Sequence, residues 1–381
     1  MAALKSQLCL NITLLFLLFV RVYPIRFTNF ASPPENNKYN YNVEADMDDQ
    51  FDVFGVSPSN YHHNVNVVPN YHEASVVVAA DGTGSFKKIM DAIAVAPSTG
   101  TKGFVIHIKK GIYQEYVTVD KPNIFLVGEG LDVTTITGNR DRVSGYDKER
   151  SVINAPNFIA MNLTIENTSP MEGGQAVALS ISSDQSVIYN CAIRSNQDTL
   201  YAVSGRQFYK KCTIVGTVDF IFGYATAFFQ NCQIETRTRS ATVITANGRG
   251  SADDKSGFVF QFCRIYGNPD LTRSWPTFLG RPWGSYSRMV IMQSYMDKYI
   301  NGSGWESFGP EPVPPHSENL FIAEYKNDGP GADVAHRIQW PGYHVLRSDK
   351  EAEDFTVDRF IDGKSWLPAT RIPHFGGLKR E

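Results

Sequence analysis

The sequence predicts an all-β fold: a right-handed parallel β-helix with a short N-terminal capping helix and a C-terminal extension of helix and loop. Cys191, Cys212 and Cys232 lie 21 and 20 residues apart, each in a similar aromatic and Ile-containing unit. Short apolar strands, separated by Gly, Asn and Asp, recur along the chain at intervals of roughly 20 to 30 residues, as in a solenoid. A sandwich or barrel would also contain short strands, but the shared phase of the cysteines favours the β-helix.

The N-terminal segments precede this fold. Residues 1–25 are typical of a secretory signal peptide, because Lys5 is followed by an apolar stretch from Leu8 to Val20. The stretch is shorter than the ~20 residues of a membrane span, so we expect the signal to be removed and the mature chain to leave the membrane. A retained signal anchor is the alternative. Residues 26–73 are rich in Asn, Tyr, Pro and His without an apolar period, which predicts a flexible polar leader.

The ordered domain is expected over residues 74–370. It begins with a strand at 74–80, which is followed by a turn and a helical pattern from Phe86 to Val95. This helix would cap one end of the solenoid, since an open end exposes core residues and strand edges. Repeated strands follow from Phe104 to about 293. A closing helix is expected at 348–354, and residues 371–381 form a C-terminal tail.

Charge and export limit the functions that we consider. A formal net charge of −3 gives no basic footprint, so nucleic acid is excluded as a partner. Export makes Asn162, Asn167 and Asn301 candidate glycosylation sites. Because the repeat would bury the first two, we retain Asn301. The histidines show no metal-ligand spacing, and we predict neither a metal nor a cofactor.

Four cysteines remain after signal removal: Cys191, Cys212, Cys232 and Cys263. Their common phase predicts a ladder of small core residues first. An oxidising compartment also permits a disulfide, for which Cys232 with Cys263 is the second interpretation.

The chemistry is expected at two aspartates on consecutive coils. Asp198 lies seven residues after Cys191, and Asp219 lies seven after Cys212. Stacked coils are about 4.8 Å apart, so the two carboxylates become neighbours, and one can act as an acid while the other is an anionic base or nucleophile. Gln175 and Gln197 share this spacing and could stabilise an oxyanion. The alternative for each Asp is a side chain that caps a turn.

Two further side chains lie later in the sequence. Arg281 could hold one carboxylate ionised through a bidentate pair, and Trp283 could offer a flat face to a sugar. The alternatives are a surface cation for Arg281 and a core aromatic for Trp283.

Four motifs together resemble the plant pectinesterases (pectin methylesterases). They are Gly174–Leu179 (GQAVAL), Gln197–Tyr201 (QDTLY), Gly216–Gly223 (GTVDFIFG) and Leu279–Trp283 (LGRPW). The resemblance extends from about Val76 to Pro368 and implies a secreted, cell-wall esterase that hydrolyses the C6 methyl esters of homogalacturonan.

The resemblance also implies roles for these residues. Asp219 corresponds to the nucleophile, Asp198 to the proton donor and acceptor, and Gln175 and Gln197 to the oxyanion stabilisers. Arg281 would pair with Asp219. Three aromatic residues would line the sugar groove: Trp283, Tyr201 and Phe222. The expected partners are pectin and a proteinaceous pectinesterase inhibitor, and a monomer is expected.

Several segments depart from the family pattern. The polar leader is too short for the inhibitor-like helical region of many relatives, so the chain resembles the subgroup without it. A charged segment at 140–150 replaces a small, Thr-rich loop, and Trp305–Phe308 lacks a usual second Trp. Thr164 stands where relatives have a disulfide partner for Cys191, which leaves the Cys232–Cys263 pair. Competing functions are a pectate lyase or polygalacturonase on the same fold, and a non-catalytic wall-binding β-helix.

Overall fold

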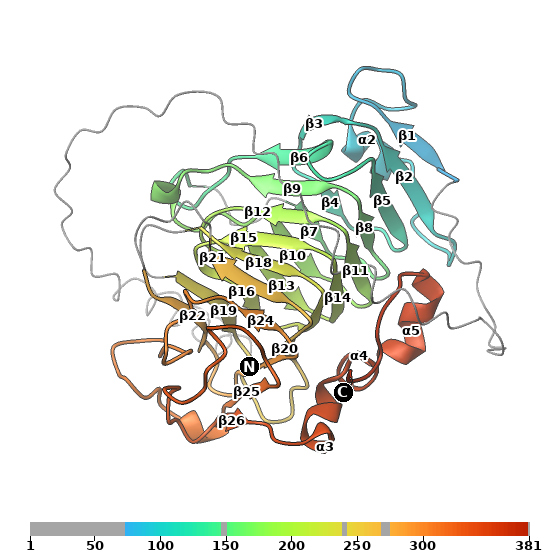
Figure 1. Cartoon of the computed structure of the whole chain (residues 1–381). Coiled ribbons are helices and arrows are strands. Elements are labelled where there is room, and N and C mark those ends of the chain that lie inside the picture. The colour runs from blue at the N-terminus through green and yellow to red at the C-terminus, as the bar shows by residue number, and fades with distance from the viewer. Residues whose placement is uncertain (1–72, 146–150, 238–241, 268–274, 380–381) are drawn as a thin grey trace, which may run out of the picture. The chain divides into compact units, whose positions relative to one another are not determined.

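The computed structural model describes residues 73–145, 151–237, 242–267 and 275–379, and within them the chain forms a right-handed parallel β-helix (Figure 1). The predicted signal peptide and, apart from Glu73, the predicted leader lie outside these residues. None of the described helices is long and apolar enough to cross a membrane.

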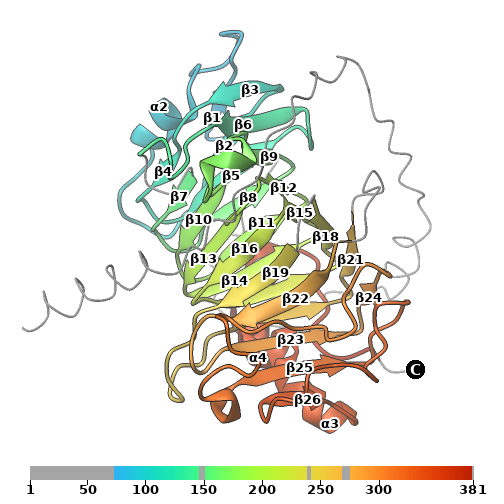
Figure 2. The same ribbon diagram turned by 90° about the vertical axis from the view of Figure 1, so that its left-hand side faces the viewer.

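Three parallel sheets, here named A, B and C, account for the described strands (Figures 1 and 2). Sheet A contains, in spatial order, β1 (Val76–Val78), β2 (Phe104–Ile108), β5 (Ile124–Gly128), β8 (Ile159–Met161), β11 (Ser186–Tyr189), β14 (Arg206–Lys210), β17 (Thr226–Gln230), β20 (Gly257–Gln261), β23 (Arg288–Met292), β25 (Phe321–Tyr325) and β26 (Tyr343–Val345). Sheet B contains β3 (Gly111–Gln114), β6 (Thr134–Gly138), β9 (Thr164–Asn167), β12 (Ala192–Arg194), β15 (Thr213–Gly216), β18 (Gln233–Thr236), β21 (Arg264–Gly267) and β24 (Tyr295–Met296). Sheet C contains β4 (Thr118–Val119), β7 (Ser151–Ile153), β10 (Leu179–Ser182), β13 (Leu200–Ser204), β16 (Val218–Gly223), β19 (Thr242–Asn247) and β22 (Thr277–Pro282).

Each complete coil passes through sheets A, B and C in turn, as β11, β12 and β13 do. At the corner between sheets A and B, one residue adopts the left-handed backbone conformation, and this recurs in successive coils. Asparagine tolerates this conformation because its side chain bonds locally. The apolar segment 158–165 is divided in this way into β8 and β9 at Asn162, where φ is 56°. The corner residues are Asn162, Asn190, Lys211, Asn231, Phe262 and Gln293. Lys326 has the same conformation directly after β25.

The core is filled by columns of identical or similar side chains. Tyr209, Phe229 and Phe260 stack with ring centroids 4.6 and 4.5 Å apart. The predicted cysteine column is confirmed, with Cys191, Cys212, Cys232 and Cys263 all buried in the same core cluster.

The predicted Cys232–Cys263 disulfide is wrong for this structure, in which all four buried cysteines are free thiols. Each sulfur points the same way from its coil and donates to backbone carbonyls. Cys232 Sγ donates to Tyr209 O at 3.4 Å, and Cys263 Sγ donates to Phe229 O at 3.3 Å. A disulfide needs β-carbons about 3.8 Å apart, closer than the roughly 4.8 Å spacing of aligned coils.

The capping helix is present but shorter than predicted. The helix α2 (Ile89–Ala94) buries Ile89, Ala92 and Ile93 in the main core cluster, which closes the N-terminal end of the stack. Phe86, predicted as helical, instead forms a β-bridge with Val78.

Short helices follow the last coil. The described ones are α3 (Asp349–Ala352), α4 (Val357–Phe360) and α5 (Gly363–Thr370), with the 3₁₀ turn η4 (Glu353–Phe355) between α3 and α4. The other described 3₁₀ turns, η2 (Met171–Gly173) and η3 (Ser317–Asn319), lie earlier in the chain. Ser348 caps α3 by accepting a hydrogen bond from Glu351 N, as a closing helix at 348–354 requires. Trp366 and Leu367 of α5 pack on the outer face of sheet A.

The predicted C-terminal tail, as far as Lys379, runs across successive coils of sheet A. Three glutamines, one on each coil, donate side-chain hydrogen bonds to it. Gln230 Nε2 donates to Phe375 O at 2.8 Å, Gln261 Nε2 to Gly377 O at 2.9 Å, and Gln293 Nε2 to Lys379 O at 2.7 Å. The alternation matches an extended backbone whose carbonyls face the sheet at every second residue.

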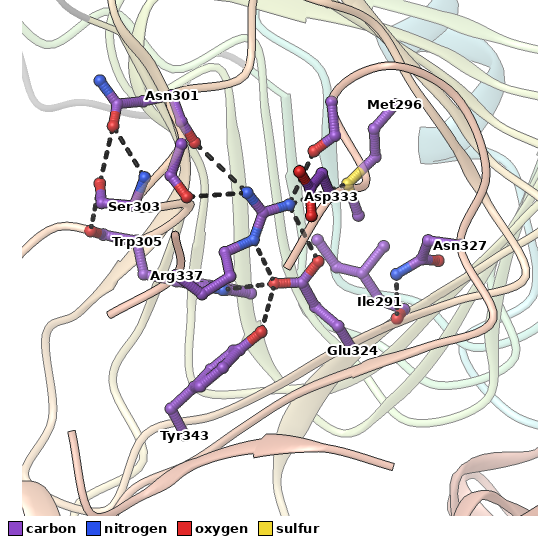
Figure 3. Close-up of polar contacts among 12 residues, drawn as sticks. Ile291, Met296, Asn301, Ser303, Trp305, Glu324, Asn327, Asp333, Arg337 and Tyr343 are labelled. Atoms are coloured by element: carbon purple, nitrogen blue, oxygen red, sulfur yellow. Dashed lines mark hydrogen bonds and ion pairs between the residues drawn. The ribbon is translucent and has the colours of Figure 1, made fainter. Parts of the chain in front are cut away.

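A buried ion pair lies beside the last coils (Figure 3). Glu324 in β25 and Arg337 have side chains that are 2% and 1% exposed, and Arg337 Nε lies 2.8 Å from Glu324 Oε1. Trp305 Nε1 and Tyr343 OH donate to the same oxygen at 3.2 and 3.0 Å. Arg337 also donates to the carbonyls of neighbouring loop residues, including Gly331 O at 2.7 Å. The pair therefore ties several irregular segments together.

The candidate glycosylation sites differ in access. Asn167 is 3% exposed and donates to Arg140 O and Val177 O, and the side chain of Asn162 accepts from Asn190. Asn301 is half-buried, with Oδ1 accepting from Ser303 N at 2.9 Å. Glycosylation of Asn301 stays a prediction.

Candidate active site

The two predicted aspartates lie on adjacent strands of sheet C, opposite one another in register. Leu200 of β13 pairs with Ile221 of β16, and extension of this register by two residues places Asp198 opposite Asp219. Asp198 N donates to Val218 O at 3.1 Å, which fixes the alignment. Adjacent parallel strands are about 4.8 Å apart. The 21-residue spacing therefore places the two aspartates opposite one another on adjacent strands, as predicted.

The backbone at both aspartates is unusual. Asp198 and Asp219 have φ angles of +61° and +48°. The pairing of β16 with β19 shifts register between Val218 and Ile221, which is a bulge-like irregularity that includes Asp219 and Phe220. Bulges redirect side chains and are common next to active sites, and non-glycine residues with positive φ carry strain. The carboxyl groups remain largely covered, since Asp198 is 7% and Asp219 is 8% exposed.

Arg281 reaches Asp219 from β22, two strands away. Its Nε and Nη2 donate to the two carboxylate oxygens at 2.8 and 2.5 Å, a bidentate pair. The intervening register partner of Arg281 is Ala246, whose short side chain leaves room for the arginine. Burial lowers the pKa of Arg281, but the hydrogen bonds and negative charge of Asp219, with smaller contributions from Glu306 and Asp198, outweigh it and raise that pKa overall. The arginine is thus a half-buried cation that is paired within the site, and not a free surface residue.

The two glutamines lie on consecutive coils before the aspartates. Gln175 and Gln197 form a parallel β-bridge, and both are half-buried. The main-chain oxygen of Gln197 accepts from Ala176 N at 3.0 Å. On the far side of Gln175, Arg142 Nη1 donates to its Oε1 at 3.2 Å. The order along sheet C is therefore Gln175, then Gln197 with Asp198, then Asp219.

Aromatic side chains form a continuous surface next to the carboxylates. Tyr201 and Phe222 stack with centroids 4.4 Å apart and planes within 7°, and Trp283 lies 6.2 Å from Phe222. Trp283 is half-buried in a small cluster outside the main core. The structure thus brings the three predicted aromatic residues into one cluster, in which Phe222 is buried, and argues against a position of Trp283 in the main core.

Sequence reasoning missed three residues near this surface. Tyr224 lies 4.8 Å from Trp283, and burial, aided by Tyr201, raises the pKa of Tyr224 to about 12. Phe308 is 38% exposed, with Arg281 Cζ 4.5 Å above its ring. Glu306 N donates to Gly280 O, so this carboxyl group lies one strand beyond Arg281. After β22 the sequence repeat becomes irregular, so the positions of Glu306 and Phe308 could not be predicted from the spacing of the coils.

Burial raises the pKa of Glu306, Asp219 adds to the rise, and Arg281 opposes it. The site therefore combines Asp219, paired with Arg281, with a second carboxyl group at Asp198 and two amide side chains. Such a set suits nucleophilic acyl transfer, in which one carboxylate attacks, one carboxyl group transfers protons and amide N–H groups stabilise negative charge. Among the described residues, no three His, Cys, Asp or Glu side chains gather in a way that could hold a metal ion.

Comparisons with known proteins agree on one family. Residues 75–364 match the model of the pectinesterase family. The "Probable pectinesterase/pectinesterase inhibitor 32" of Arabidopsis thaliana is 46% identical over 320 residues, which are 81% of this chain and 60% of that protein. The chain thus spans about 60% of the length of the curated relatives it matches.

Solved structures show the same similarity. The structure of pectin methylesterase from carrot superposes with a TM-score of 0.77 at 40% identity, covering 80% of this chain and 98% of that one. A pectin methylesterase in complex with a hexasaccharide superposes with a TM-score of 0.65 at 29% identity, covering 76% of this chain and 97% of the other.

Proposed function

This chain belongs to the pectinesterase family, and from that premise we propose that it hydrolyses the C6 methyl esters of homogalacturonan, converting pectin and water to pectate and methanol. The observation that carries the proposal is the bidentate Asp219–Arg281 pair beside Asp198 on the adjacent strand. Hydrolysis through two carboxyl groups needs one that stays ionised and one that exchanges protons. The arginine supplies that asymmetry, since it contacts Asp219 directly.

In the first half of the reaction, a carboxylate oxygen of Asp219 attacks the ester carbonyl carbon. The carbonyl oxygen becomes negatively charged, and the side-chain N–H groups of Gln175 and Gln197 stabilise it. As the tetrahedral intermediate collapses, the bond to the methoxy group breaks, and Asp198 gives that oxygen a proton, so methanol leaves. An anhydride between Asp219 and the galacturonate carboxyl group remains.

In the second half, water resolves this acyl-enzyme. Asp198, now ionised, takes a proton from the water while its oxygen attacks the galacturonyl carbon. The anhydride bond breaks and releases the galacturonic acid, whose new carboxyl group then gives its proton to the solvent. Asp219 returns to its ionised form beside Arg281, and Asp198 is again protonated for the next ester.

Substrate binding uses the aromatic surface. Trp283 and Tyr201 are half-buried aromatic residues that pack against the buried Phe222, and their rings suit the C–H faces of a sugar chain. Pectin is therefore the proposed substrate. The double name of the Arabidopsis relative includes an inhibitor, which supports a proteinaceous pectinesterase inhibitor as a further partner. We extend the proposal to secretion into the cell wall and action as a monomer.

Methanol release tests this function. We expect purified protein from residue ~27 onward to release methanol from highly methylated pectin, and Asp219→Asn to release none above background. Circular dichroism would verify that the variant is folded. A folded wild-type protein that releases no methanol from acid to neutral pH would instead favour a non-catalytic wall-binding β-helix.

A further inference from the structure

The side-chain amide of Gln175 has two ends with opposite chemistry. Its NH₂ group donates hydrogen bonds and can stabilise an oxyanion, whereas its carbonyl oxygen would repel one. The proposed reaction therefore requires that the NH₂ end face the ester. Nothing within the glutamine itself enforces this orientation, because the two ends have nearly the same shape.

Arg142 supplies the missing constraint. Its Nη1 donates to Gln175 Oε1 at 3.2 Å, and its backbone N donates to Gln175 O at 3.1 Å. A guanidinium group has five N–H donors and no acceptor, so it pairs with the carbonyl end of the amide and not with the NH₂ end. The NH₂ end of Gln175 must then point away from Arg142.

We propose that Arg142 is a positioning residue that orients the Gln175 amide, so that its NH₂ group faces the carbonyl oxygen of the substrate ester. The inference rests on the proposed esterase function and deepens it. The guanidinium of Arg142 also lies one coil before Gln175, where its positive charge would stabilise an oxyanion.

The backbone that carries Arg142 is held by contacts that do not involve its side chain. Asp141 is 4% exposed and accepts hydrogen bonds from Ser169 Oγ at 2.6 Å and Ser144 N at 2.7 Å. The hydrogen bond from Ser169 contributes most to lowering the pKa of Asp141, and the bond from Ser144 adds to it. Val143 N donates to Gly173 O at 3.2 Å. Replacement of the exposed Arg142 side chain should therefore remove the guanidinium and leave the segment in place.

Gly173 shows how closely this segment is docked. A β-carbon at Gly173 would lie 2.6 Å from Ser169 Oγ and 2.7 Å from the carboxyl carbon of Asp141. Only glycine fits there without displacing these groups. The position of Arg142 relative to Gln175 is thus built into the packing of the two segments.

A double-mutant cycle tests the inference. We would measure kcat and KM for methanol release by the wild type, Arg142→Ala, Gln175→Ala and the double variant. Arg142→Ala should lower kcat on the order of ten- to a hundredfold with KM little changed, as expected for a misoriented catalytic group. In the Gln175→Ala background the same substitution should have almost no further effect, because the amide that it orients is absent.

Two further variants separate positioning from other roles. Arg142→Lys retains a donor-only group and should recover part of kcat. Arg359→Gln, in α4, removes one positive charge in the C-terminal helices and should leave kcat unchanged. Thermal unfolding of each variant reports on folding.

Additive losses in the double variant would overturn the inference, because Arg142 would then act independently of Gln175. A rise in KM alone would also overturn it and would point to direct binding of a substrate carboxylate by Arg142. Absence of methanol release by the folded wild type would overturn the proposed function itself, and the role of Arg142 in it would fall as well.

Discussion

Two arginine–carboxylate pairs in this β-helix have similar chemistry and opposite surroundings. At the candidate active site, the side chains of Arg281 and Asp219 are 23% and 12% exposed. We call them the groove pair, after the sugar groove that the family resemblance implies there. Near the last coils, those of Arg337 and Glu324 are 1% and 2% exposed (Figure 3). The buried carboxylate accepts from Trp305 and Tyr343 as well as from Arg337, whereas the groove pair is partly exposed.

This difference indicates what each pair can do. A buried carboxylate whose oxygens all accept hydrogen bonds cannot attack a substrate. Removal of its arginine partner destabilises the protein, because an unpaired charge is then buried. A pair at an accessible surface is worth little in stability but can hold a nucleophile ionised. We therefore expect the groove pair to determine activity and the buried pair to determine stability.

The largest expected effect comes from the groove pair. Asp219→Asn should reduce methanol release on the order of 10⁴-fold or more, as loss of a nucleophile does in other hydrolases. The melting temperature should change little, since Arg281 can still be solvated from the groove. Rate assays and calorimetry on the same preparation would measure both effects, and a large fall in melting temperature would break the comparison.

The buried pair should behave in the opposite way. Arg337→Met leaves Glu324 charged and buried without its partner, so the free energy of unfolding should fall by about 3–5 kcal/mol. Urea unfolding would measure this loss. The activity of the protein that remains folded should be close to that of the wild type.

A matched double variant sharpens this prediction. Glu324→Gln combined with Arg337→Met removes both charges and keeps an amide oxygen to accept from Trp305 and Tyr343. It should be more stable than Arg337→Met alone. A double variant that is less stable than this single variant would show that packing and not charge explains the loss.

The aromatic surface should give a smaller effect on binding. Trp283→Ala removes the ring beside Phe222 and Tyr224 and should raise KM about tenfold, equivalent to about 1.4 kcal/mol. The kcat value should change less, because the ring does not contact the Asp219–Arg281 hydrogen bonds. Phe375→Ala, in the tail on sheet A, is the control, and an equal rise in KM there would argue against a specific sugar contact.

The smallest effect concerns Glu306, the carboxyl group one strand beyond the groove pair. Burial raises its folded-state pKa, so its protonated form is favoured in the folded protein. The corresponding stability is fully present below the unfolded pKa of about 4.3 and is lost as pH rises through the folded pKa. Glu306→Gln should therefore raise the melting temperature slightly at neutral pH and have no effect near pH 3.

Melting temperatures from pH 3 to 8 would check this prediction. The exposed Glu311→Gln serves as the control and should show no comparable trend. A lower melting temperature for Glu306→Gln at neutral pH would contradict the sign and would mean that attraction to Arg281 outweighs the cost of burial.

Much of the site follows from the phase of the repeat. Asp198 and Asp219 differ by 21 residues, the same offset as Leu200 and Ile221, which pair in the structure. A parallel β-helix converts a constant spacing along the chain into adjacency in space. The order of Gln175, Gln197 and the aspartates along sheet C could thus be predicted from residue numbers.

Predictions that did not rest on the spacing of the sequence repeat were less accurate. The sequence pattern extended the capping helix to Phe86, which forms a β-bridge, and it allowed a disulfide where the thiols stay free. Helical periodicity does not locate a helix end, and proximity on adjacent coils does not bring two sulfur atoms into bonding geometry. Both errors concern local geometry that side-chain packing determines.

The sequence by itself determined the coil period, the core columns and the adjacency of the two aspartates, because all three depend on spacing alone. Only the tertiary structure decided the bulge at Asp219, the reach of Arg281 across Ala246 and the contact of Arg142 with Gln175. These features depend on register shifts, on the size of an intervening side chain and on loops that leave the repeat. Such contacts join residues whose separation in the sequence follows no period, so their partners can be identified only after the coils have been stacked.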